Sequence, residues 1–133
     1  MKLGVICDGI SRDLAHSLNV MDEFGLEYAE LQFVGDKEVG DHSKTEIKEI
    51  DTLLRDRGKP VSCLSRHIFA GMTSQNKPGD ELHLKHMDAL KRVVEMAHIV
   101  GSPFVRIMTQ KKRANSMGFS WGREVECGAW SVG

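Results

Sequence analysis

Six polar residues stand within or directly after four short apolar runs of the sequence. They are Asp8, Glu30, Gln32, His67, Arg106 and Thr109. Carboxylate, amide, imidazole, guanidinium and hydroxyl groups can together bind the hydroxyl groups of a small polar molecule and transfer protons to or from it. We therefore take these six residues as the candidate substrate-binding residues of the chain.

His67 is the candidate with the widest chemistry. A neutral imidazole can ligate a metal ion or bind a hydroxyl group, and it changes its protonation state near neutral pH. The alternative is a loop histidine that is hydrogen-bonded to its own surroundings. The sequence leaves both interpretations open.

Glu30 lies inside an apolar run, where a carboxylate is costly to bury unless it is paired. Arg106 in another such run is the expected partner, and a Glu–Arg pair could orient a polyol substrate. A purely structural buried pair is the alternative. Asp8 precedes Gly9, so an Asp-Gly turn explains this residue as well as a contact with substrate does.

Other polar groups are weaker candidates. The run 109–113 is basic and could meet a sugar phosphate, although a solvated surface is the more ordinary interpretation. His83 and His86 stand three positions apart and could form a metal pair, but without an HExxH-type partner a solvent-exposed face is expected. The three cysteines fit no metal-binding or disulfide spacing, and those within the apolar runs are expected to pack as small apolar residues.

The apolar runs are typical of strands. They are Leu3–Cys7, Tyr28–Val34, Val61–Ser65 and Phe104–Met108. Because these strands alternate with segments of helical periodicity, the sequence predicts an α/β fold with a parallel sheet and helices packed outside it. The carboxyl ends of parallel strands meet at one edge, where the sites of such folds lie, so we expect the six polar residues to gather there.

Local signals place the helices and loops. Ser11 is the expected N-cap of a helix over residues 12–24. The capping-box pattern of residues 43–46 opens a second helix. Asp80 is the expected cap of a third. The charged loop 35–42 between the second strand and the second helix is a candidate site loop.

The regular pattern ends after Met108. Residues 116–133 contain two tryptophans and four glycines, with neither helical periodicity nor clear strand alternation. The expected organisation is therefore a βα domain over residues 1–110 and an irregular tail over 111–133. We interpret this tail as a truncated or frame-shifted remnant.

The charge of the chain is balanced, with 18 Lys and Arg against 19 Asp and Glu. Neither nucleic acid nor an anionic membrane is therefore an expected partner. No apolar run approaches the roughly 20 residues that a membrane-spanning helix needs. The sequence begins directly with an expected strand and shows no signal-peptide pattern, so a cytoplasmic protein is expected.

Four segments together resemble a known family. The first two are Met1-Lys2-Leu3-Gly4-Val5-Ile6 and Gly25-Leu26-Glu27-Tyr28-Ala29-Glu30-Leu31. The others are Gly58-Lys59-Pro60-Val61-Ser62-Cys63-Leu64-Ser65 and Ala97-His98-Ile99-Val100-Gly101-Ser102-Pro103-Phe104-Val105-Arg106. In this order and spacing, residues 1–110 resemble the sugar phosphate isomerase/epimerase family of xylose-isomerase-like TIM barrels.

The resemblance implies the N-terminal half of a TIM (β/α)8 barrel, with about four strands and three helices. It implies a metal-dependent isomerase or epimerase of a sugar or sugar phosphate that transfers a proton through an enediolate. In the family, later strands carry both the ligands of the divalent metal (Mg, Mn, Co or Zn) and the catalytic glutamates. No residue here matches them, so this chain alone is expected to lack activity, and its residues would shape the sugar pocket. In the related endonuclease IV branch a histidine after the third strand ligates metal, which makes His67 a weak metal candidate.

Two other functions stay open. One is a non-enzymatic α/β binding module or inactive fragment, and the other is an endonuclease IV-like metal enzyme, which the balanced charge disfavours. A half barrel has two open edges, so a homodimer formed through them is expected. The sequence does not decide which sugar or acid is the substrate, which metal is used or which oligomer forms.

Overall fold

The computed structural model describes residues 1–109 and 127–131, which form an α/β fold as the sequence predicts. Five strands make one sheet in the order β1-β2-β5-β6-β7. Their bounds are β1 Gly4–Ile6, β2 Tyr28–Leu31, β5 Val61–Ile68, β6 Phe104–Met108 and β7 Cys127–Ser131. The helices are α1 Leu14–Glu23, α2 Lys44–Asp56 and α3 Glu81–Val100, with a short 3-10 helix η1 at Cys7–Gly9. A hairpin of β3 Phe33–Val34 and β4 Lys37–Glu38 precedes α2.

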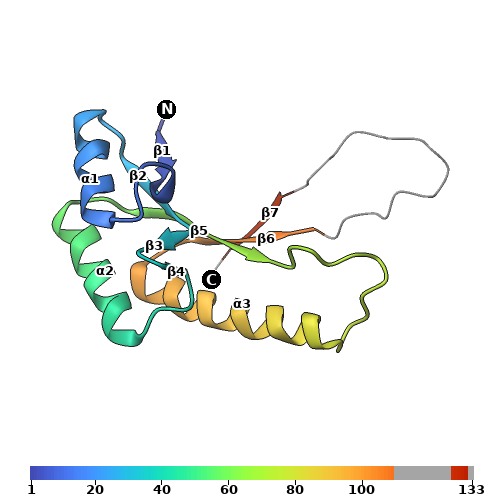
Figure 1. Cartoon of the computed structure of the whole chain (residues 1–133). Coiled ribbons are helices and arrows are strands. Elements are labelled where there is room, and N and C mark those ends of the chain that lie inside the picture. The colour runs from blue at the N-terminus through green and yellow to red at the C-terminus, as the bar shows by residue number, and fades with distance from the viewer. Residues whose placement is uncertain (110–126, 132–133) are drawn as a thin grey trace.

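The first four strands of this order are parallel, and a helix lies in each connection between them (Figure 1). Gly4 pairs with Tyr28, Ala29 with Val61, and Leu64 with Val105. The register of β5 shifts against both of its neighbours, which marks bulges in this central strand. Bulges re-aim side chains near functional sites, and β5 carries four of the polar or thiol groups considered below.

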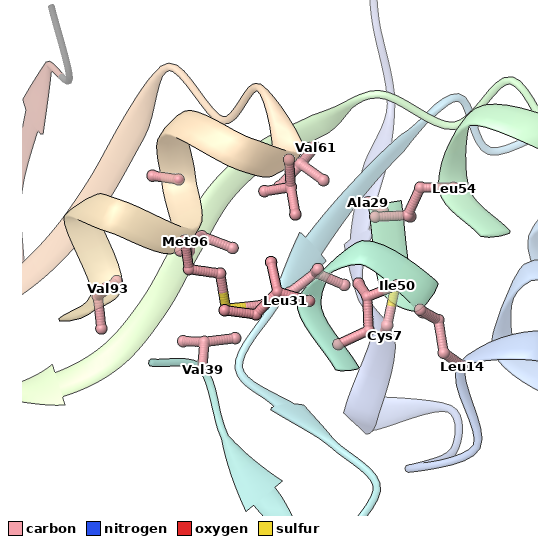
Figure 2. Packing of buried hydrophobic residues seen from close by; sticks show 14 of the residues in the cluster. Cys7, Leu14, Ala29, Leu31, Val39, Ile50, Leu54, Val61, Val93 and Met96 are labelled. Atoms are coloured by element: carbon pink, nitrogen blue, oxygen red, sulfur yellow. The ribbon is translucent and has the colours of Figure 1, made fainter. Parts of the chain in front are cut away.

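One face of the sheet packs against the three helices. Alternate strand residues Ala29, Leu31, Leu64 and Val105 are buried there with the apolar stripes of the helices. Figure 2 shows Ala29 and Leu31 within this core. Tyr28 and Glu30, which alternate with them, lie on the opposite face and are half-buried. The alternation of residues 28–31 therefore sorts the side chains as the sequence predicts.

Helix starts agree only partly with the expected caps. The Ser43 capping box is confirmed, since Ser43 Oγ accepts from Glu46 N and Glu46 Oε2 accepts from Ser43 N. The expected Ser11 cap is wrong, because Asp13 is the N-cap of α1 and Ser11 Oγ instead accepts from Asp13 N. Asp80 stands at the N-cap of α3, but its carboxylate accepts from Lys77 N rather than from the helix.

Two strand boundaries differ from the sequence prediction. The strand expected over 28–34 leaves the sheet after Leu31, and the following residues form the β3–β4 hairpin, whose second strand lies in the expected site loop. The strand expected over 61–65 continues to Ile68, so His67 lies within β5 and not after it. Both changes bring the loop 35–42 against the end of β5, where it can contribute to a site.

The tail is not irregular throughout. Residues 127–131 form β7, which pairs antiparallel with β6 from Phe104↔Ser131 to Met108↔Cys127. The remainder of the expected tail and most of the basic run, residues 110–113, lie outside the described residues. Within the described part of the chain, no helix combines the length and hydropathy needed to cross a membrane.

The hairpin is fastened to α2 by an ion pair. Lys37 Nζ donates to both carboxylate oxygens of Glu46, at 2.8 and 2.9 Å. This bond, together with the backbone N–H of Ser43, lowers the pKa of Glu46 to about 2. The ion pair therefore helps to hold Glu38, the next residue of the hairpin, at the end of β5.

We expect the Glu46 carboxyl group to titrate near pH 2 in the folded protein, well below the usual 4.5. Because the folded pKa is lowered, the stabilisation is present above pH 4.5 and is lost as the pH falls through about 2. Side-chain carboxyl NMR chemical shifts followed against pH measure this value. Lys37→Met should raise it toward 4.5, and an unchanged value in that variant would contradict the ion pair.

Candidate functional site

Five of the six candidate residues fall into two separate groups, and Thr109 belongs to neither. Glu30 and Arg106 lie on the sheet face that is turned away from the helices, and Asp8 in η1 follows β1 beside them. Gln32 and His67 lie at the ends of β2 and β5, and their side chains are in contact. Thr109 directly follows β6 and is exposed.

Ser65 links the two residues that were expected to pair. Its hydroxyl group donates to Glu30 Oε1, while its backbone carbonyl accepts from Arg106 Nη2 at 3.3 Å. No ion pair joins Glu30 to Arg106 directly, so that prediction is wrong for these two described residues. The bulged strand β5 passes between β2 and β6, and it places Ser65 where a direct contact was expected.

This inner-face cluster, which comprises Asp8, Glu30, Cys63, Ser65 and Arg106, contains two unmatched polar atoms. Asp8 Oδ1 and Arg106 Nε are both buried, and within residues 1–109 and 127–131 neither has a hydrogen-bond partner. An unpaired buried polar group costs about 1–3 kcal/mol, so such groups usually indicate a missing partner. Here one group is an acceptor and the other a donor.

The second group is built around His67 and the hairpin. Glu38 Oε1 accepts from His67 N at 3.1 Å and lies 2.8 Å from His67 Nδ1. A carboxylate only accepts, so this contact places the proton of the neutral ring on Nδ1 and leaves Nε2 as an acceptor. The Gln32 amide nitrogen lies 3.1 Å from both ring nitrogens. Glu38 therefore orients the imidazole, and Gln32 lies against the ring beside both nitrogens.

Two arginines hold the hairpin residues in place. Arg66, whose side chain is 15 % exposed, lies 3.6 Å from Glu38 Oε2 and 2.9 Å from Asp41 Oδ1. It also donates to Val39 O at 2.8 Å. Arg92 of α3 donates to Asp41 and to the backbone carbonyl of Gly40. We call Gln32, Glu38, Asp41, Arg66, His67 and Arg92 the rim network.

Asp41 is the carboxylate that both arginines share. Burial tends to raise its pKa, but the hydrogen bonds and charges of Arg66 and Arg92 outweigh burial and hold the pKa below the usual 3.8. Asp41 is therefore ionised at every pH near neutrality. The rim network thus keeps a fixed arrangement of charges around the end of β5.

Sequence reasoning missed several of these residues. Glu38 and Asp41 lie in the loop that was singled out as a site loop, but nothing in the sequence distinguished them from the other charged residues there. Ser65 ends a predicted strand, and Arg66 precedes His67, so proximity in the sequence could have found both. Nothing in the sequence around Arg92 marks it as a site residue. It lies on α3, and the fold brings it to Gly40 in the site loop.

Cys7 and Cys63 are poor nucleophiles. Burial, together with the charges of Asp8 and Glu30, raises the pKa of Cys7 to about 11. Burial likewise raises the pKa of Cys63. Both thiols are therefore protonated near neutral pH, as expected for small packing residues, although Cys7 lies in η1 and not in a strand.

His83 and His86 do not form the exposed face that the sequence suggested. Both rings pack against Phe69. The centroid of the Phe69 ring lies 6.1 Å from that of His83 and 5.7 Å from that of His86. Each ring accepts a backbone N–H through Nδ1, from Gly79 and Phe69 respectively, at 3.1 Å. These histidines therefore fasten a loop to α3.

No metal centre is assembled by the described residues. Within residues 1–109 and 127–131, no three His, Cys, Asp or Glu side chains are placed to hold one ion. His67 has Glu38 as its one close carboxylate, and Gln32 lies at its other ring nitrogen. A divalent metal therefore does not fit these residues unless further ligands are supplied.

Comparisons with known proteins leave the family undecided. No protein-family model matches the chain, and no curated protein matches it.

Proposed function

We propose that this chain forms the sugar-binding half of a sugar or sugar-phosphate isomerase or epimerase with a TIM-barrel architecture. The four parallel strands with helices on one face support this proposal, because they have the layout of consecutive βα units. The resemblance of residues 1–110 to the xylose-isomerase-like barrels supports it further. The substrate would lie on the sheet face that carries the inner-face cluster.

The unmatched pair of buried atoms carries the proposal. Asp8 Oδ1 is an acceptor and Arg106 Nε is a donor, and neither has a partner among the residues that the structure describes. Sugar hydroxyl groups both donate and accept hydrogen bonds, so hydroxyl groups at different positions of one sugar or sugar phosphate can serve the two atoms. An apolar ligand would leave both unsatisfied.

The rim network adds a group that can move a proton. His67 is half-exposed, and Glu38 orients its ring. Its Nε2 could take a proton from a substrate hydroxyl group in exchange for the contact with Gln32. We assign His67 this role in place of metal binding. A divalent metal stays part of the proposed reaction, with ligands from outside the described residues.

The proposal predicts sugar binding that depends on Arg106. Two-dimensional ¹H–¹⁵N NMR during titration with aldoses, ketoses and their phosphates should shift the amide signals of Asp8, Glu30, Ser65 and Arg106. Arg106→Met should raise Kd by about tenfold, because it removes one charged hydrogen-bond donor from the sugar. Signals that shift elsewhere would contradict the proposal.

Arg55→Met is the matched control for this titration. Arg55 is 68 % exposed on α2 and pairs with Asp51, away from the inner-face cluster. Arg55→Met removes the same charge as Arg106→Met and keeps a similar apolar stem. The Kd of this variant for the sugar should therefore equal that of the unaltered protein. An equal loss of affinity in both variants would indicate a general charge effect.

A binding module without catalysis is the second candidate, because no three described side chains can hold a metal. Deuterium transfer from D₂O to the carbon next to the sugar carbonyl separates the two functions. Transfer in the presence of Mg²⁺, Mn²⁺, Co²⁺ or Zn²⁺ supports the isomerase. Sugar binding without transfer under any of these ions supports the module.

The proposed homodimer would use β1 or β7, the end strands of the sheet.

A further inference from the structure

The segment 69–79, here called the latch segment, follows the rim network directly. It begins two residues after His67, whose carbonyl accepts from Ala70 N at 3.2 Å. Its other backbone hydrogen bonds form short-range turns, such as Met72 N to Phe69 O and Asn76 N to Thr73 O. Local turns of this kind do not fasten a segment to the rest of the fold.

Two histidines of α3 attach the segment by hydrogen bonds, in addition to the burial of Met72. His86 Nδ1 accepts from Phe69 N at the start of the latch segment, and His83 Nδ1 accepts from Gly79 N at its end. The Phe69 ring is stacked on His83 with an interplanar angle of 10°. Among the described residues other than glycine, Phe69 is the one with a positive φ, at 61°. The surrounding contacts must hold this strained conformation in place.

An accepting nitrogen carries no proton, so both rings are neutral in this arrangement and bear their proton on Nε2. Protonation would turn each Nδ1 into a donor that faces another donor, and both attachments would break. We propose that His83 and His86 form an acid-sensitive latch that holds residues 69–79 against α3 and releases them when the rings are protonated.

Charged groups around these rings come from three elements: Glu38 of β4, Arg66 of β5, and Asp80, Glu81 and Lys85 at the start of α3. Burial lowers the pKa of His86 below 6.5, and Lys85 and Arg66 act in the same direction. The backbone of Ala70 and the charge of Glu38 oppose this shift but do not cancel it. The attachment at His86 is therefore intact above pH 6.5 and is lost as the pH falls through the lowered value.

Release would uncover Met72, which is 2 % exposed, and would loosen the chain beside His67. An effect of acid on sugar binding would rest on the proposed function. The latch itself does not, because its test needs no ligand.

Amide hydrogen exchange of the full chain, followed by NMR at pH 7.5 and 5.0 and corrected for the intrinsic rate, tests the latch. Protection of the Phe69 and Gly79 amides should be lower at pH 5.0 than at pH 7.5, with a fall of roughly five- to tenfold for a fully protonated ring, the value expected for one lost hydrogen bond. In the double variant His83→Asn, His86→Asn, an amide oxygen can accept in place of Nδ1 without titrating. Protection there should not change with pH.

His98→Asn is the matched control, since His98 lies exposed near the end of the same helix. It should keep the full pH dependence. Equal protection at both pH values in the unaltered protein would overturn the proposal, and so would an undiminished pH dependence in the double variant. Long-range ¹H–¹⁵N correlation spectra at pH 7.5 give a test without substitutions. A proton on Nδ1 of either ring would also overturn the latch.

Discussion

Gly40→Ala is expected to lower the free energy of unfolding by about 2–4 kcal/mol. Gly40 is buried between the hairpin and α3 and has a φ of +92°, which side chains of L-residues rarely adopt. A Cβ atom there would lie 2.7 Å from Val93 Cγ2 and 3.2 Å from Val93 N. The backbone nitrogen belongs to α3 and cannot move aside cheaply.

The site loop depends on this close approach. Gly40 O accepts from Arg92 Nε at 3.1 Å, and the neighbouring Val39 is fully buried in the core cluster shown in Figure 2. Asp41, on the other side, binds both arginines of the rim network. A displacement at Gly40 would therefore disturb the core and the rim network together.

Gly35→Ala is the matched control for Gly40→Ala. Gly35 also has a positive φ, +65°, but a Cβ atom there would meet nothing within 4 Å. Its substitution should cost about 1 kcal/mol from the backbone alone. Urea unfolding followed by circular dichroism measures both values. Equal losses in the two variants would show that the contact with Val93 is not tight.

The parallel strands and the helices were largely predictable from the sequence, because their signals are local. Alternation in residues 28–31 and the capping box at Ser43 each act over a few residues, and both appear in the structure as predicted. β6 has the predicted bounds, from Phe104 to Met108. At these places the local conformational preference and the burial pattern favour the same structure, so tertiary contacts do not change it.

The missed elements depend on contacts between distant segments. The end of β5 at Ile68 is fixed by pairing with Ile107, 39 positions later. The sequence of residues 66–68 contains no pattern that predicts this end. β7 exists through its pairing with β6, and its glycine-containing sequence shows little strand propensity. Such strands can be predicted only when the strands they pair with are known.

The candidate site was predictable in place but not in its contacts. The expectation that polar residues gather at the carboxyl ends of the strands follows from parallel topology alone, and Gln32 and His67 do meet there. The partner of Glu30 was missed because a bulge, which sequence patterns rarely announce, brings Ser65 between Glu30 and Arg106. Register, and not residue type, decided that contact.

Arg66→Met is expected to lower the free energy of unfolding by about 2–4 kcal/mol. Methionine keeps much of the apolar stem of arginine but removes the charge and its donors. Glu38, whose side chain is 16 % exposed, would lose a cation at 3.6 Å, and Asp41 would lose one at 2.9 Å. Val39 O would lose its donor as well. A buried carboxylate without its cation costs more than an exposed one.

The pH dependence of this loss identifies its cause. Arg66 helps to lower the pKa of Asp41 below 3.8, so its stabilisation is present above pH 3.8 and fades as the pH falls through the lowered value. The difference between Arg66→Met and the unaltered protein, measured by urea unfolding, should therefore shrink from pH 7 to pH 3. A difference that stays constant over this range would assign the loss to packing.

Two further variants separate charge from geometry at this position. Arg66→Lys keeps the charge but cannot contact Glu38, Asp41 and Val39 O together, so it should cost about half as much as Arg66→Met. Arg55→Met removes an exposed i,i+4 ion pair with Asp51 and should cost less than about 0.5 kcal/mol. If Arg66→Met were no more destabilising than Arg55→Met, the rim network would be a solvated surface, and the orientation of His67 by Glu38 would lose its support.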